Sequence, residues 1–249
     1  MTEIAVALLL FVGAFVAGEV GFRLGRVTGP RDEAFTKQLG AISGATFALV
    51  AFLIGFGFSG AATRFIDRLD LIVKEANALG TAYLRADVLP QPSRDELKVA
   101  LRDYASSRVE LLSSRAPATI AVQLGNVGSQ HQRLWDIGLR GTSGRLELMM
   151  LVLPSLNDVI DLHTTHLSAA RRQIPTAILT ALILSAAVSL ALASFGNGQA
   201  GRRYPILNFV YGFSLATALW MTIDLDHPTR GLIQQNIQPM IDALASMKG

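Results

Sequence analysis

The 249-residue sequence contains no cysteine and few charged residues. The absence of cysteine excludes disulfides, thiolate metal sites and cysteine nucleophiles. Charged residues make up 16% of the chain and apolar residues 51%, whereas soluble domains carry about 25% charged residues. The net charge of +3 is too small and too scattered to indicate a nucleic-acid partner, although it is compatible with anionic lipid heads. This balance is typical of a chain with several lipid-facing segments.

Four apolar segments are long enough to cross a membrane. They predict an all-α integral membrane protein with four transmembrane helices and a helical extramembrane domain. Four crossings place both termini and the middle domain on the same side. Basic residues are balanced between the two sides, so charge alone does not orient the chain. The expected organisation is a transmembrane hairpin in residues 1–60 (spans 4–22 and 39–59), a helical extramembrane domain in residues 61–172, a second transmembrane hairpin in residues 173–224 (spans 174–195 and 205–223) and an amphipathic C-terminal helix in residues 225–249.

The second span carries small residues along one face. At about 100° per residue, a narrow stripe contains Gly44, Ala48, Ala51, Gly55 and Ser59, with Phe52 and Phe56 on one flank and Phe47 and Phe58 on the other. Small residues let helix backbones approach closely in a membrane, so this face is expected to meet protein or a pore. Thr46, Leu49, Val50 and Leu53 are expected to face lipid instead.

No proline stops this helix after the membrane, and an apolar seam continues along it. The seam contains Phe65, Leu69, Ile72, Ala76, Leu79 and Tyr83 in steps of four and three, close to a heptad pattern. Glu75 and other charged residues are expected on the remaining faces. Two interpretations stay open: the seam packs on later helices of the same chain, or copies from several subunits gather around an axis.

Later segments predict further helices separated by a loop. A capping box of Ser93 and Glu96 predicts a helix start, and Leu97, Leu101, Tyr104 and Val109 give that helix an apolar face. Gly125 and Gly128 indicate a loop over residues 116–130.

Several polar residues in or near the spans are candidates for function. Glu19 lies inside the first span, where Arg23 is its expected ion-pair partner. Asp224 and Asp226 close the fourth span. Either Asp226 caps the tail helix, with Pro228 in the first turn, or the two acids mark a cation pathway or an ion-dependent latch. A similar choice between a structural and a functional role exists for a polar group on the second helix, Glu75, Asn77, Thr81 and Arg85. If the tail folds back, their partners can be Asp224, Asp226 or Arg230.

Nothing in the sequence predicts an enzyme. No nucleophile motif, P-loop or dinucleotide fingerprint is present. His163 and His166 have a spacing that zinc can use, with Asp158 and Asp161 nearby. His163, however, lies on an apolar helix face and His166 is expected to point elsewhere. We therefore predict buried, hydrogen-bonded histidine, with no metal and no cofactor.

Three separated motifs carry a family resemblance. They are the segment from Glu75 to Ala86 followed by Leu89 and Pro90, the segment from Leu156 to His163 with Arg172 and Pro175, and the segment from Asp224 to Pro228 with Arg230 and Gly231. Together they resemble a bacterial family of bestrophin-like membrane proteins. The resemblance covers the chain from the second span to the tail.

The resemblance implies a homo-oligomeric ion channel of the bacterial inner membrane. It implies a pentamer, a cytoplasmic middle domain and a pore lined by the second span, with membrane lipid and inorganic ions as partners. Pore-lining candidates are then Ala48, Phe52, Gly55, Phe56 and Ser59, where an apolar ring can gate by dewetting. No clear acidic calcium-binding loop is present. The alternative is a non-conducting membrane scaffold or sensor whose helical domain binds a partner.

Overall fold

The structure, a computed structural model, describes residues 3–227 and 231–247. All regular structure in this part of the chain is helical, which confirms the all-α prediction. The helices are α1 (Glu3–Thr28), α2 (Glu33–Arg85), the short 3₁₀ helix η1 (Ala86–Val88), α3 (Ser93–Ser113), α4 (Pro117–Thr142), α5 (Leu146–Arg171), α6 (Thr176–Gln199), α7 (Pro205–Asp226) and α8 (Gln238–Ser246).

In the described residues, four helical segments are long and apolar enough to cross a membrane. They lie in α1, in α2, in the stretch that contains α6 and in α7. Helix α2 has 53 residues, which corresponds to about 80 Å at about 1.5 Å per residue. Because a hydrocarbon core is about 30 Å thick, only part of α2 lies within it.

The chain forms two compact units. The first, here called the membrane unit, contains residues 1–64 and 173–233, and the second, the helical unit, contains residues 65–172 and 234–249. Each unit is therefore built from two separate stretches of sequence. In the sequence, the second hairpin of the membrane unit lies between the two stretches of the helical unit.

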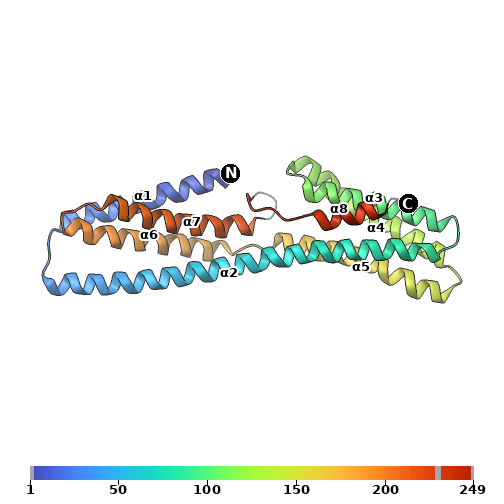
Figure 1. Cartoon of the computed structure of the whole chain (residues 1–249), viewed down its shortest axis with the longest axis horizontal. Coiled ribbons are helices and arrows are strands. Elements are labelled where there is room, and N and C mark those ends of the chain that lie inside the picture. Colours follow the sequence, from blue (N-terminus) through green and yellow to red (C-terminus); the bar gives the residue numbers. More distant parts are fainter. Residues whose placement is uncertain (1–2, 228–230, 248–249) are drawn as a thin grey trace. The chain divides into compact units, whose positions relative to one another are not determined.

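In the membrane unit, α1 and α6 pack backbone against backbone, and α7 lies beside both (Figure 1). A Cβ atom on Gly21 would lie 2.1 Å from the Ala191 carbonyl oxygen, and one on Gly198 would lie 2.2 Å from that of Phe22. Gly25 meets Phe195 in the same way. Larger side chains do not fit there, so these glycines permit the close approach that stabilises helix pairs in membranes.

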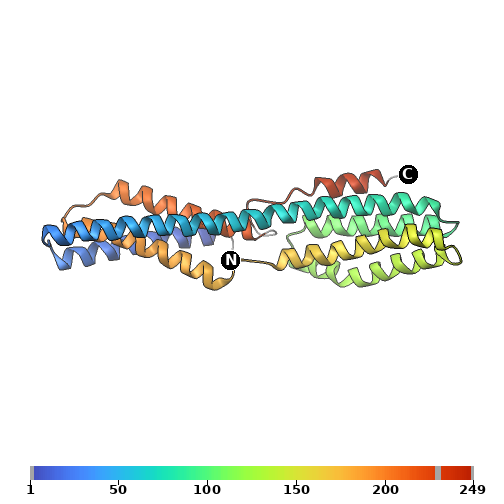
Figure 2. The same ribbon diagram turned by 90° about the horizontal axis from the view of Figure 1, so that it is seen from below.

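The helical unit has an apolar core made by α2, α3, α4, α5 and α8. Figure 2 shows α3, α4 and α5 along the C-terminal part of α2. The part of the predicted α2 seam from Ile72 to Tyr83 lies in this core, where Ile72 and Leu79 are fully buried, whereas Phe65 and Leu69 lie outside it. Leu97, Leu101 and Tyr104 of α3 face them, as predicted. The intramolecular interpretation is therefore confirmed for the seam from Ile72 to Tyr83.

The C-terminal segment completes that core. Met240 and Met247 are fully buried among the side chains of the helical unit. The Met247 carbonyl accepts hydrogen bonds from the Tyr83 hydroxyl at 2.8 Å and from Arg102 Nε at 3.0 Å. The tail helix begins only at Gln238, later than the predicted residue 225. The described residues before it, 231–237, are not helical.

The loop predicted over residues 116–130 is wrong, because α4 starts at Pro117 and is helical throughout this stretch. Gly125 and Gly128 lie on its exposed side, where a Cβ would touch nothing within 4 Å. Val127, Leu134 and Ile137 are buried on the other side. Each glycine costs a helix about 1 kcal/mol, and this packing outweighs the cost.

The predicted capping box at Ser93 is also wrong. Pro92 occupies the N-cap position of α3, and no side chain caps the helix. Glu96 instead accepts a hydrogen bond from Arg140 of α4 at 2.7 Å. The sequence has the capping-box pattern, but the glutamate binds an arginine of a neighbouring helix instead of the helix start.

Candidate pore-lining face and buried polar clusters

One face of α2 packs against its own membrane unit. Val50 and Ile54 are buried in a small apolar core with Leu182, Ala186 and Leu219, and Leu53 lies at its edge. The expectation that Val50 and Leu53 face lipid is therefore wrong. The hydropathy of a membrane helix does not tell lipid-facing from protein-facing leucine or valine, because both environments are apolar.

The opposite face of α2 is uncovered in the single chain. Ala48, Phe52, Gly55, Phe56 and Ser59 are all exposed, with Phe52 at 68% and Phe56 at 75%. A Cβ atom on Gly55 would meet nothing within 4 Å. At about 100° per residue, these positions lie roughly opposite Val50 and Ile54. The whole predicted pore-lining set is thus available to another molecule.

A buried ion cluster lies in the helical unit. Arg108 Nη2 of α3 donates to Glu75 Oε2 at 2.9 Å, and His166 Nδ1 of α5 lies 3.1 Å from the same oxygen. All three side chains are buried. Burial opposes ionisation of Glu75, but the hydrogen bonds from His166 and Arg108 outweigh it and lower its pKa. The expectations that Glu75 lies on a solvated face and that His166 points elsewhere are wrong.

Aromatic rings extend this cluster through the core. The His131 ring lies 5.3 Å from both the Tyr104 and the His163 rings, centroid to centroid, and His131 Nε2 is 3.3 Å from the Tyr104 hydroxyl. Burial, with repulsion from the Arg108 charge, lowers the pKa of His163 to about 4. His163 is buried as predicted, but its Nδ1 makes no hydrogen bond within the described chain.

The histidines do not form a metal site in the described residues. His166 directs Nδ1 toward Glu75. Asp158 and Asp161 are exposed, and Asp161 accepts from Asn157 at 2.7 Å. The spacing of His163 and His166 therefore serves core packing and hydrogen bonding.

Asp224 and Asp226 at the end of α7 bind protein groups within the membrane unit. Asp224 accepts from the backbone N–H groups of Leu232 and Ile233, each at 2.8 Å. Asp226 accepts from Arg64 Nε at 2.9 Å and from the Ile174 backbone N–H at 2.6 Å. The predicted cap of the tail helix by Asp226 is therefore wrong. Pro228 and Arg230 lie outside the described residues.

The other polar candidates on α2 are not partners of one another. Asn77 is exposed, so it does not require a buried partner from the tail. Arg85 donates from Nη1 to the Leu151 carbonyl at 3.1 Å. The predicted ion pair of Glu19 and Arg23 is present at 2.8 Å, and Arg203 joins it at 3.0 Å.

Sequence reasoning missed Arg108 as a member of the ion cluster. The signal was present, because the series of apolar positions 97, 101 and 104 of α3 continues at position 108. A charged residue on the apolar face of a helix needs a buried partner of opposite charge. Glu75 of α2 is likewise a charged residue on a buried helix face, so the same argument predicts that it has a buried partner of opposite charge.

The fold and the clusters define an all-helical membrane protein with a water-exposed helical unit. Comparison with known families adds a specific assignment, since the Bestrophin-like domain matches residues 9–240. The chain therefore belongs to the bestrophin-like family.

Solved structures show the same fold at low sequence identity. A crystal structure of a bacterial bestrophin homologue from Klebsiella pneumoniae, carrying a point mutation, aligns with a TM-score of 0.65 and 14% identity over 98% of both chains. Another of that homologue, phased with zinc, aligns with a TM-score of 0.61 and 15% identity over 98% of this chain and 95% of the other. A mutant membrane protein aligns with a TM-score of 0.68, 16% identity and 98% coverage of both chains. No curated protein sequence matches the chain significantly.

Proposed function

We propose that the chain is one subunit of a homo-oligomeric, bestrophin-like ion channel in the bacterial inner membrane. Ions pass passively along a central axis lined by the uncovered face of α2. Ala48, Phe52, Gly55, Phe56 and Ser59 line that axis, and Phe52 and Phe56 form the apolar constriction. Five subunits and a cytoplasmic helical unit follow from the family resemblance.

The observation that carries the proposal is the exposure of this α2 face. Its small residues and phenylalanines lie opposite Val50 and Ile54, which pack inside the membrane unit. A lipid-facing surface has no need of the stripe of small residues at positions 44, 48, 51, 55 and 59. In a ring of subunits the same stripe brings helices close to an axis, and two aromatic rings per subunit narrow it.

Ion flux into liposomes tests the proposal directly. Purified protein is expected to conduct, and Phe52→Ala and Phe56→Ala are each expected to change the flux at least severalfold because they widen or wet the constriction. Leu8→Ala is the control, since Leu8 is also an exposed apolar residue but lies on α1 and not on the α2 face. Absence of flux under every gradient and voltage would contradict the channel.

The mass of the detergent-solubilised protein tests the assembly. A pentameric mass is expected for a chain of 26.7 kDa. In vesicles, a Phe52→Cys variant is expected to react with small water-soluble thiol reagents, because a pore-lining position is reached from water and a lipid-facing position is not. The chain is free of native cysteine, so the reagent reports that position alone. A stable oligomer with a sealed axis and no flux would favour a non-conducting scaffold or sensor.

A further inference from the structure

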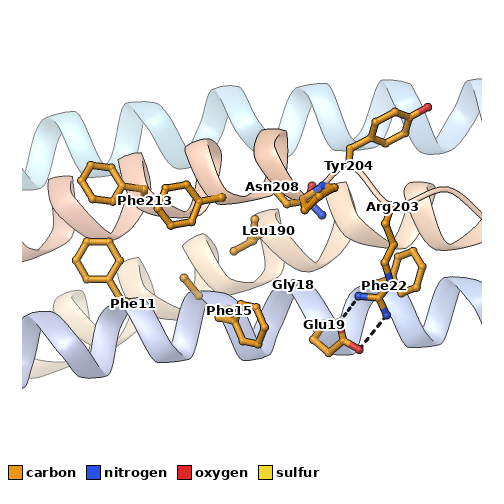
Figure 3. Close-up of a pocket in the computed structure, with 14 residues that line it drawn as sticks. Phe11, Phe15, Gly18, Glu19, Phe22, Leu190, Arg203, Tyr204, Asn208 and Phe213 are labelled. Atoms are coloured by element: carbon orange, nitrogen blue, oxygen red, sulfur yellow. Dashed lines mark hydrogen bonds and ion pairs between the residues drawn. The ribbon is translucent and has the colours of Figure 1, made fainter.

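A groove of about 390 Å³ runs along the membrane unit between α1, α6 and α7 (Figure 3). Its walls are phenylalanines of α1 and α7, among them Phe11, Phe15 and Phe213, and Leu190 of α6 lines it between them. Phe15 is 76% exposed and Phe213 is 48% exposed. The groove is therefore open to whatever surrounds these helices, which for membrane-spanning helices is lipid.

The groove has the length of one lipid chain. Its α1 wall runs from Phe11 to Phe22, which corresponds to about 17 Å of helix. Half of a hydrocarbon core is about 15 Å. One acyl chain that starts at the membrane surface thus extends along the whole groove.

One end of the groove is polar and positively charged. Glu19 is held there by Arg203 at 3.0 Å (Figure 3), and Arg23 binds the same carboxylate at 2.8 Å, so two guanidinium groups face one carboxylate. The Arg203 guanidinium also lies over the Phe22 ring, 4.0 Å from its centroid. This stacking fixes Arg203 at the mouth of the groove with 58% of its side chain exposed.

The N-terminus of α7 adds to the positive potential at the same end. Tyr204 and Pro205, where α7 begins, line the groove next to Arg203. The first N–H groups of a helix have no partner within the helix, and the helix dipole favours an anion there. No side chain caps this helix start. A phosphate at the mouth therefore meets the Arg203 guanidinium group and the positive end of the α7 dipole.

We propose that this groove binds an anionic phospholipid, with one acyl chain between the phenylalanines and the phosphate at Arg203 and the start of α7. The lipid occupies the leaflet on the side of the two short connections, residues 29–32 and 200–204. This site is separate from the α2 face and does not depend on conduction.

Photo-crosslinking in vesicles tests both parts of the proposal. Phosphatidylglycerol and phosphatidylcholine that carry the same photoreactive acyl chain are compared at equal mole fraction. Phosphatidylglycerol is expected to label the peptides that contain Phe15 and Phe209 about fivefold more strongly, since one basic residue near anionic lipid is worth about 1 kcal/mol. Equal labelling by the two lipids, or no labelling of these peptides, would overturn the proposal.

Matched variants separate the head-group contact from the chain contact. Arg203→Gln is expected to abolish the preference for phosphatidylglycerol, and Glu19 keeps Arg23 as a partner. Arg202→Gln removes the same charge from a residue that does not line the groove, and the preference should remain. Ala14→Leu fills the groove and should lower labelling by both lipids, whereas Gly13→Leu adds the same side chain where nothing lies within 4 Å.

Folding and assembly are checked in the same samples. Each variant should keep the melting temperature of the parent protein within a few degrees, and loss of labelling without that change assigns the effect to the groove. A Phe15→Cys variant that forms a disulfide or a short crosslink with a second copy of the chain would show that a neighbouring subunit covers the groove. That result would also overturn the proposal.

Discussion

The two units of the chain are stabilised by different kinds of contact. In the membrane unit, glycines let α1 and α6 touch through their backbones. In the helical unit, large apolar side chains surround an ion cluster of Glu75, Arg108 and His166. Lipid tails are as apolar as leucine, so membrane helices gain little from apolar side chains and associate through close packing. Water-exposed helices gain from apolar burial, and their buried charges then need exact partners.

The largest loss of stability is predicted for a substitution that breaks the ion cluster. Glu75→Gln leaves the buried Arg108 charge without its counter-ion, which costs about 3–5 kcal/mol and lowers the melting temperature by roughly 10 °C. The measurement is thermal unfolding of the purified protein. Glu33→Gln is the control, because the Glu33–Lys37 pair is exposed and such pairs contribute little. A double variant that replaces both Glu75 and Arg108 with apolar residues should recover part of the loss.

The second prediction concerns the glycine contact in the membrane unit. Gly21→Ala places a methyl group against the Ala191 backbone, and overpacking of this kind costs about 1–3 kcal/mol. Gly13→Ala on the same helix should change little, since its Cβ would meet nothing. The measurement is the melting temperature and the yield of folded protein in detergent. Equal stability of the two variants would contradict backbone-to-backbone packing of α1 and α6.

The third prediction concerns acid sensitivity of the helical unit. His163 has a folded-state pKa of about 4, below its ordinary value of about 6.5, so the unfolded chain binds a proton first. The contribution of neutral His163 to the free energy of unfolding is therefore fully present above about pH 6.5. It is lost as the pH drops toward 4, which lowers the free energy of unfolding by about 1–2 kcal/mol after allowance for solvent screening. His163→Leu should flatten the melting temperature over this range. His227→Gln, whose residue belongs to the membrane unit, should not.

The smallest predicted effect on stability lies on the uncovered face of α2. Gly55→Ala should change the free energy of unfolding of the chain by less than about 0.5 kcal/mol, because nothing lies near the new methyl group. Flux and oligomer mass should respond instead, because the face is proposed to line the pore. A loss of monomer stability with unchanged flux would show that Gly55 packs within the chain.

The all-helical fold and four apolar spans were predictable because hydropathy and the helical period are local properties of sequence. The seam from Ile72 to Tyr83 was predictable for the same reason. Which face of the second span packs inside the chain was not, since Val50 is as apolar as a lipid-facing residue. The helix at Pro117 was missed because its glycines lie on the solvent side. The partners of Glu75 and Asp226 come from residues more than 30 positions away, and no short motif reports such pairings.

The closure of the helical core by Met240 and Met247 has a consequence for biosynthesis. The ribosome makes residues 65–172 of the helical unit before residues 173–233 of the second hairpin, and the segment that fills the remaining core positions follows that hairpin. Apolar surface near Tyr83 thus stays open until residues 240–247 have been made. Maturation of the water-exposed part therefore waits for synthesis of the second hairpin, and a chain stalled before Met240 exposes apolar core residues.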